Sequence, residues 1–118
     1  MSRIPAFVES TDVALARAFP GVRLVDFGHL GDGNLHYNVQ AAEGDSGPEF
    51  LREHETAVNT IVYDAVAAHD GSISAEHGIG ELKREELGTR KSPVALGLMR
   101  AIKQALDPHG LLNPARLL

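Results

Sequence analysis

The sequence predicts an α+β fold in which one antiparallel β-hairpin packs with three to four helices. Apolar residues recur at helical spacing in separate stretches of the chain. Two short runs of branched and aromatic residues flank Asp32-Gly33, and such a dipeptide between extended runs is the strongest short-range signal of a hairpin. The chain has 118 residues, enough for one small core, so we expect a single domain over residues 1–118.

The first two helices are predicted from apolar stripes and from the residues at their ends. Residues 5–19 carry the first stripe, which Pro20 interrupts. The second stripe runs over residues 49–69, with Pro48 suited to the first turn and Gly71 just past the end. Both stretches are long enough for ordinary amphipathic helices.

The C-terminal third of the chain is predicted to continue with a loop and two helices. Residues 72–80 contain too many glycines for a helix, so we expect a loop or a short strand there. A short helix is predicted over residues 81–87. The last helix has Ser92 as its expected N-cap and Pro93 in its first position, and Asp107-Pro108 ends it.

The predicted hairpin joins residues 22–30 to residues 35–40. A lone two-stranded hairpin is marginally stable in water, and apolar side chains would occupy both faces of this one. We therefore expect it to form part of a larger antiparallel sheet. The other strands would come from a further part of the polypeptide, from a second copy of the chain, or from an edge that the sequence does not reveal.

A turn centred on Asp32-Gly33 places His29 directly opposite His36. Directly opposed residues have Cβ atoms about 4.5 to 5.5 Å apart, close enough for two imidazoles to share one metal ion. The alternation of side chains puts Asn38 and Phe27 on the same face, so Asn38 is placed to touch whatever the metal holds. A single histidine on a strand is more often a hydrogen-bonded structural residue, and it is the pairing that predicts a metal site.

A third metal ligand must come from elsewhere, and Glu76 in the glycine-flanked loop is the natural candidate, with His77 beside it. Two imidazoles and one carboxylate with open positions form a catalytic rather than a structural metal pattern. These ligand types suit zinc, manganese and iron alike. The alternative is that Glu76 and His77 belong to a solvated loop, and Asp32 is most simply a turn residue.

Composition excludes several classes of function. The net charge is -5 and no run of Lys or Arg forms a basic stripe, so we expect no nucleic-acid partner. No apolar run approaches the roughly 20 residues that cross a bilayer, and the first residues lack the apolar segment of a secretory signal. We therefore expect a cytoplasmic protein without a transmembrane segment. Because the chain has no cysteine, any transition metal must be held by His, Asp or Glu.

Two motifs resemble the signatures of a known family. They are GHLGDGNLHYN at residues 28–38 and SAEHGIG at residues 74–80. Together they resemble the FAD-linked oxidase carboxy-terminal domain, a family that includes D-lactate dehydrogenases, the flavin subunit of glycolate oxidase and D-2-hydroxyglutarate dehydrogenase. The chain's closing segment, with Asp107-Pro108 and Leu112-Asn113-Pro114, is also similar, so the resemblance covers essentially the whole chain. It implies the ferredoxin-like half of a flavoenzyme substrate domain.

The resemblance also implies the roles of individual residues. His29, His36 and Glu76 would bind the divalent metal, Asn38 would contact the substrate, and His77 would contact the substrate and act as the base. The implied reaction oxidises a D-2-hydroxy acid to the 2-oxo acid by hydride transfer to FAD.

Members of this family are several times longer and carry a flavin-binding domain before this region. We therefore expect the chain to be a fragment of a longer enzyme, inactive alone and without bound FAD, whose partner is the flavin-binding domain. Two alternatives stay open. One is a non-catalytic metal-binding module that forms homo-oligomers through its sheet edges. The other is a metal-dependent hydrolase, since Gly-Asp and Gly-Asn-x-His fragments also occur in such enzymes.

Overall fold

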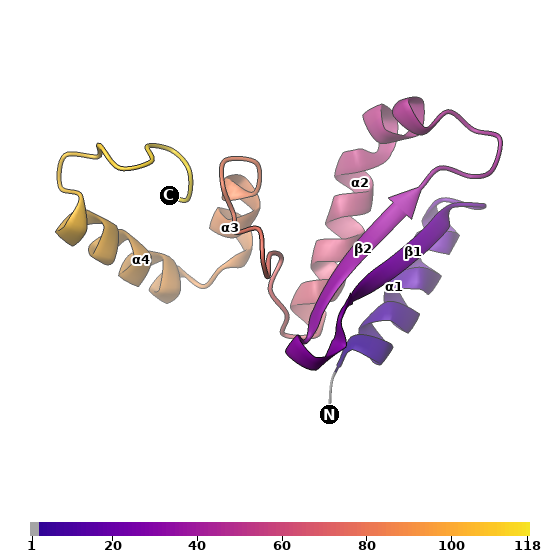
Figure 1. The fold of residues 1–118 in the computed structure, drawn as a ribbon, viewed down its shortest axis with the longest axis horizontal. Coiled ribbons are helices and arrows are strands. Elements are labelled where there is room, and N and C mark those ends of the chain that lie inside the picture. Colours follow the sequence, from indigo (N-terminus) through magenta and orange to yellow (C-terminus); the bar gives the residue numbers. More distant parts are fainter. Residues whose placement is uncertain (1–2) are drawn as a thin grey trace. The chain divides into compact units, whose positions relative to one another are not determined.

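The computed structural model describes residues 3–118, with the backbone alone described at Leu30. It confirms the predicted α+β class. The chain divides into two compact units, unit 1 (Met1–Ile73) and unit 2 (Ser74–Leu118). The elements of the described residues follow in chain order as α1 (Ile4–Ala18), β1 (Arg23–His29), the 3-10 turn η1 (Leu30–Asp32), β2 (Asn34–Gln40), α2 (Gly47–Ala68), α3 (Arg84–Arg90) and α4 (Pro93–Leu106) (Figure 1).

In unit 1 the two strands form an antiparallel hairpin, and α1 and α2 pack against each other behind it (Figure 1). This α-β-β-α order is the central part of the ferredoxin-like β-α-β-β-α-β motif. The core lies between the helices and the hairpin, where Leu15 of α1 is fully buried and Val58 of α2 is nearly so. Tyr37 of β2 reaches the helices, because its ring contacts Phe7 edge-to-face at 5.7 Å between centroids.

The helix boundaries in unit 1 agree with the predicted ones to within two residues. Helix α1 starts and ends one residue earlier than predicted. Helix α2 begins at Gly47 because the Ser46 hydroxyl caps it, accepting the amide hydrogen of Glu49 at 3.4 Å. The proline at position 48 lies in the first turn, where its missing N–H costs no hydrogen bond.

The register of the hairpin differs from the predicted one. His29 pairs with Asn34, and His36 pairs with Phe27, so the prediction that His29 faces His36 is wrong. The reason lies in the turn. The chain reverses through residues 30–33, as a 3-10 turn followed by Gly33 in the left-handed region at φ 70°, so the loop is centred one residue before Asp32-Gly33. When the centre of the turn moves by one residue, each residue of β1 faces a residue of β2 two positions away from the predicted one, so His29 faces Asn34 instead of His36.

The two strands approach each other very closely at Gly28. A Cβ atom placed on Gly28 would lie 2.3 Å from the carbonyl oxygen of Asn34 and 2.9 Å from the Cα of Leu35. Both are backbone atoms, which cannot move aside as a flexible side chain would. The glycine at the start of the GHLGDGN segment is therefore required by the width of the hairpin, whereas Gly33 is required by its turn.

Unit 2 contains α3 and α4. The short helix is displaced from its predicted range 81–87. It begins later because residues 79–83 form a turn. It continues past Gly88 to Arg90, and an ion pair between Arg90 and Glu86 (2.7 Å) spans its last turn. Ser92 caps α4 as predicted, its hydroxyl accepting the amide hydrogen of Ala95 at 3.2 Å.

At its other end α4 is closed by Asp107, whose carboxylate accepts the amide hydrogens of Leu111 and Leu112 at 2.8 and 2.9 Å. The Nζ of Lys103 donates to the same carboxylate. This Lys103 hydrogen bond, helped by the backbone amides, lowers the pKa of Asp107, against a smaller opposing effect of burial. In residues 3–118 we find no helix with the length and apolar character needed to cross a bilayer.

Candidate functional site

One face of the hairpin in unit 1 carries the side chains that sequence reasoning singled out. Paired residues share a face and alternate residues return to it, so the observed register puts His29, His36 and Asn38 on the same side, with Val25 and Phe27. This face is opposite to the one from which Tyr37 reaches α1. Val25 is 44% exposed and Phe27 59% exposed, so apolar side chains also face outward on this surface in the described residues. We refer to this surface as the open face.

On the open face His29 and His36 are diagonal neighbours rather than direct partners. Diagonal residues of an antiparallel pair are separated by about 7 to 8 Å, a distance that long and aromatic side chains still bridge. His29 is exposed and His36 is half-buried. The corrected register therefore keeps both imidazoles on one face, although it does not place them side by side.

Asn38 is oriented by the backbone around it. Its amide nitrogen donates to the carbonyl oxygen of Val25 at 3.1 Å and, at 3.4 Å, to that of His36. With the nitrogen engaged in this way, the polar atom that Asn38 offers a ligand is its carbonyl oxygen, which is an acceptor. The residue is thus suited to receive a hydrogen bond from a hydroxyl group.

The ring of His36 lies against the ring of Phe27 from the opposite strand. Their centroids are 5.0 Å apart and their planes are inclined by only 17°, which is a stacked arrangement. Sequence reasoning placed Phe27 on this face but gave it no role. The sequence offered one signal for such a role: Phe27 is an aromatic residue two positions before His29, and therefore on the same face of the strand.

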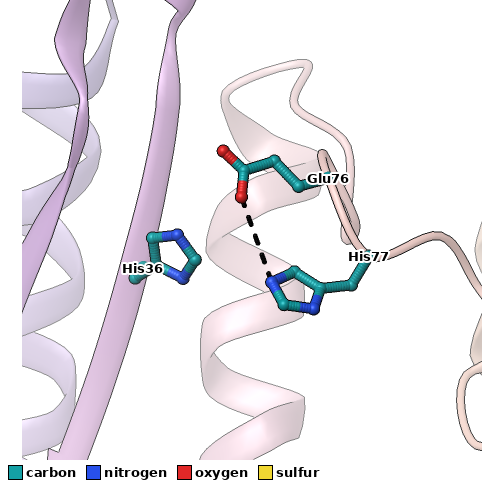
Figure 2. Close-up of side chains that lie close together, drawn as sticks. All are labelled: His36, Glu76 and His77. Carbon is teal, nitrogen blue, oxygen red and sulfur yellow. Dashed lines mark ion pairs between the residues drawn. The ribbon is translucent and has the colours of Figure 1, made fainter.

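Glu76 and His77 lie in the loop that opens unit 2. The Ser74 hydroxyl donates to the carbonyl oxygen of Gly78 at 2.5 Å and so closes the loop around the two residues. The Oε2 atom of Glu76 is 4.0 Å from the Nε2 atom of His77, the contact dashed in Figure 2. The side chains are 47% and 77% exposed respectively. His36, also drawn in Figure 2, belongs to β2 of unit 1.

The distance between Glu76 and His77 has a chemical meaning. Two ligand atoms that each lie about 2.0 to 2.2 Å from a tetrahedral metal ion are themselves about 3.3 to 3.6 Å apart. The separation of 4.0 Å is somewhat longer than this, so the two atoms would have to move closer together to bind one cation. It also allows the pair to act as a carboxylate and a neighbouring base, so the geometry of the loop permits both arrangements.

The opposite face of the hairpin carries a polar cluster of a different kind. The Tyr37 hydroxyl donates to Oδ1 of Asp12 at 2.5 Å, and Asp26 is paired with Tyr37 across the strands. The Oδ1 atom of Asp26 is buried without a hydrogen-bond partner. Burial, and then repulsion from Asp12, raise the pKa of Asp26, and a backbone hydrogen bond from Asn38 opposes them. Burial and the Asp12 hydrogen bond raise the pKa of Tyr37 as well.

A family profile and individual relatives both relate the chain to the same group of flavoenzymes. The profile of the family described as FAD linked oxidases, C-terminal domain, matches residues 1–117. The chain is 38% identical over 117 residues to a D-2-hydroxyglutarate dehydrogenase of Stutzerimonas stutzeri and 44% identical over 117 residues to one of Xanthomonas citri. It is 45% identical over 104 residues to the mitochondrial D-2-hydroxyglutarate dehydrogenase of Bos taurus.

These relatives are much longer than the chain. The two bacterial matches cover 99% of this chain but only 25% of each relative, and the Bos taurus match covers 87% of the chain and 18% of the relative. The chain therefore spans about a quarter of the length of the bacterial proteins it resembles, and both sequence motifs fall inside the matched region.

Proposed function

The chain belongs to the family of FAD linked oxidase C-terminal domains, and on this premise we propose that it supplies the divalent-metal and substrate site of an FAD-dependent D-2-hydroxy-acid dehydrogenase. The family is one of oxidoreductases and implies FAD, a substrate and a flavin-binding domain. Several relatives are named D-2-hydroxyglutarate dehydrogenases, which makes D-2-hydroxyglutarate the first substrate to test and D-lactate the second.

The single observation that carries the proposal is the open face of the hairpin. It presents two imidazoles, His29 and His36, and the acceptor oxygen of Asn38 on one side of one ribbon. Imidazole is the commonest protein ligand for zinc, and it also suits iron and manganese. With Glu76 as carboxylate ligand, the donor set fits a divalent cation that keeps coordination positions open for substrate.

When bound, the cation supplies Lewis-acid stabilisation of the substrate oxygen, and FAD in the flavin-binding domain supplies the acceptor for the hydride from C2. The side chains of this chain do the rest. Asn38 contacts the substrate from the same face of the hairpin as His36. His77, in its neutral form, takes the proton of the 2-hydroxyl group, so that loss of this proton and of the hydride yields the 2-oxo acid.

His77 has a second candidate role, which the loop geometry also permits. Because its Nε2 atom lies 4.0 Å from Oε2 of Glu76, a small movement of either side chain would let His77 serve as a further ligand of the same cation. The two roles predict opposite results for His77→Ala. A base that is not a ligand leaves metal affinity unchanged when it is removed, whereas a ligand lowers the affinity by at least as much as Glu76→Gln does.

The experiment that tests the proposal is a metal titration of the 118-residue chain with Zn²⁺, Mn²⁺ and Fe²⁺, followed by calorimetry. We expect one site per chain, strongly weakened by His29→Ala, His36→Ala or Glu76→Gln. His109→Ala, at an exposed position after α4, is the matched control and should leave the affinity unchanged. Binding that survives His36→Ala would contradict the proposed site.

The flavin part of the proposal needs the remaining three-quarters of the relatives' length. We expect the isolated chain to bind metal without FAD and to show no dehydrogenase activity. Joined to a flavin-binding domain of a bacterial relative, it should support oxidation of the hydroxy acid, and His36→Ala in the joined protein should abolish it. Hydrolysis of a phosphoester by the isolated, metal-loaded chain would instead favour the hydrolase alternative.

One observation keeps a second candidate function in view. In the described residues the sheet has two strands, so each strand has an outer edge that could pair with another chain. A non-catalytic module that binds metal and forms homo-oligomers through these edges would be dimeric or larger in light scattering, with metal but no flavin. A monomer that becomes active with a flavin-binding domain excludes it.

A further inference from the structure

We infer that Phe27 is a positioning residue for the metal ligand His36, fixing the plane in which its imidazole ring meets the cation. The inference rests on the proposed function, because it assigns a role toward the same metal site. It is carried by the cross-strand pairing of the two residues and by the parallel stacking of their rings.

The geometry restricts the imidazole in a specific way. A histidine nitrogen binds a metal in the plane of its ring, so the tilt of the ring about the Cβ–Cγ bond decides where a cation can lie. The Phe27 ring lies over the His36 ring at 5.0 Å with a tilt of 17°. Rotation of the imidazole out of this plane would give up the stacked contact with the phenyl ring. The stacked partner therefore favours one direction of the ring nitrogen before any metal arrives.

Packing within residues 3–118 does not explain where Phe27 lies. It is 59% exposed on the open face, away from the helices, and the buried apolar residues lie elsewhere. Leaving a large aromatic side chain partly in water forgoes most of the stabilisation that its burial would give. The corrected register adds a second point. The residue opposite His29 is Asn34, which has no ring, so in this strand pair the direct stacking acts on His36.

A purely structural role for the pair is the competing explanation, because cross-strand aromatic pairs also stabilise hairpins. The two roles differ in what they change. A structural pair alters the unfolding temperature and leaves the metal geometry of the folded protein intact. A positioning residue alters the affinity and the spectrum of the bound metal at temperatures where the protein is fully folded.

The test uses Co²⁺ as the probe, since its visible absorption reports ligand geometry directly, together with the NMR shifts of the His36 ring. In the full chain, we expect Phe27→Leu to weaken Co²⁺ binding by about tenfold, the lower end of the effect of removing a ligand-orienting contact. The cobalt spectrum should change as well. Phe27→Tyr, which keeps the ring, should restore both affinity and spectrum. Val25→Ala, on the same face, is the control and should change neither.

Each outcome decides the matter. If the wild-type chain binds no Co²⁺, or binds it without His36, the inference and the proposed function both fail. If binding depends on His36 but Phe27→Leu gives wild-type affinity and spectrum, the positioning role is overturned and the proposed function stands. Should Phe27→Leu fail to fold, Phe27→Met keeps the volume without the ring. Should both unfold, NMR of the wild type decides, because a His36 ring that rotates freely would overturn the inference.

Discussion

Replacing Asp26 by asparagine should stabilise unit 1 at neutral pH. The Asp26 carboxylate lies on the helix-facing side of β1 with its Oδ1 atom buried and without a hydrogen-bond partner, and Asp12 repels it. An amide is neutral, so Asp26→Asn removes both the desolvation of a charge and this repulsion.

The magnitude follows from the burial of this side chain. A fully buried polar group without a partner costs about 1 to 3 kcal/mol, and since Asp26 is only half-buried we take about 1 kcal/mol, the lower limit. For a chain of this size, 1 kcal/mol raises the unfolding temperature by about 4 °C.

The pH dependence gives the sign. The pKa of Asp26 is raised above 3.8 in the folded state, so between 3.8 and the raised value the folded state holds a proton that the unfolded state has lost. The contribution of Asp26 to stability is therefore fully present below 3.8 and is lost as the pH rises through the folded value. The variant lacks this loss, so the two proteins should differ at pH 7 and converge near pH 3.

Urea denaturation followed by circular dichroism at pH 3, 5 and 7 measures this difference. Asp45→Asn, at an exposed loop position, is the control and should show no such pH-dependent gain. A variant that is less stable than the wild type at pH 7, or a difference that is the same at all three pH values, would refute the reasoning.

Three further predictions concern the scaffold of the site. Gly28→Ala should disrupt the hairpin, because the new Cβ would lie 2.3 Å from the Asn34 carbonyl oxygen. NMR should then show that the strand pairing and the metal binding are both lost. Intact strand pairing in the variant would contradict the close approach. Leu15→Ala should cost about 2 to 5 kcal/mol in urea denaturation, since Leu15 is fully buried, and a cost under about 1 kcal/mol would mean that the core lies elsewhere. Asp107→Asn should lower the free energy of unfolding at neutral pH. It should also reduce the loss of stability that the wild type shows as the pH falls below about 4. The pKa of Asp107 is lowered by Lys103, so its contribution is present above the ordinary value of 3.8 and is lost as the pH falls through the folded value; an unchanged loss of stability at acid pH would contradict this.

The helices and their ends were predictable because their signals are local. Ser92 and Pro48 each act within one helical turn, so the sequence predicted where α4 and α2 begin to within two residues. The short helix α3 was misplaced by three residues. In the structure the helix begins at Arg84 and continues past Gly88, where an ion pair between Glu86 and Arg90 spans the last turn.

The hairpin shows why the site was only partly predictable. Residues of two paired strands keep the same shared face when the pairing shifts by two residues, so the shared face was predicted correctly for His29, His36 and Asn38. Which residue stands opposite which depends on where the turn is centred, and Asp32-Gly33 allowed two solutions that differ by one residue. The stacking of Phe27 on His36 follows from the second solution, so it could not be seen from the sequence. The ligand set, the base and the cytoplasmic location stay predictions.

The central claim is that His36 and Glu76 hold the same cation, and a double-mutant cycle on Zn²⁺ affinity tests it most directly. Calorimetry of His36→Ala, Glu76→Gln and the double variant gives the three free-energy changes. If both residues bind one ion, each single substitution should weaken binding strongly, and the double variant should lose much less than the sum of the two. Fully additive losses, or a Zn²⁺ affinity that either substitution leaves unchanged, would contradict the account.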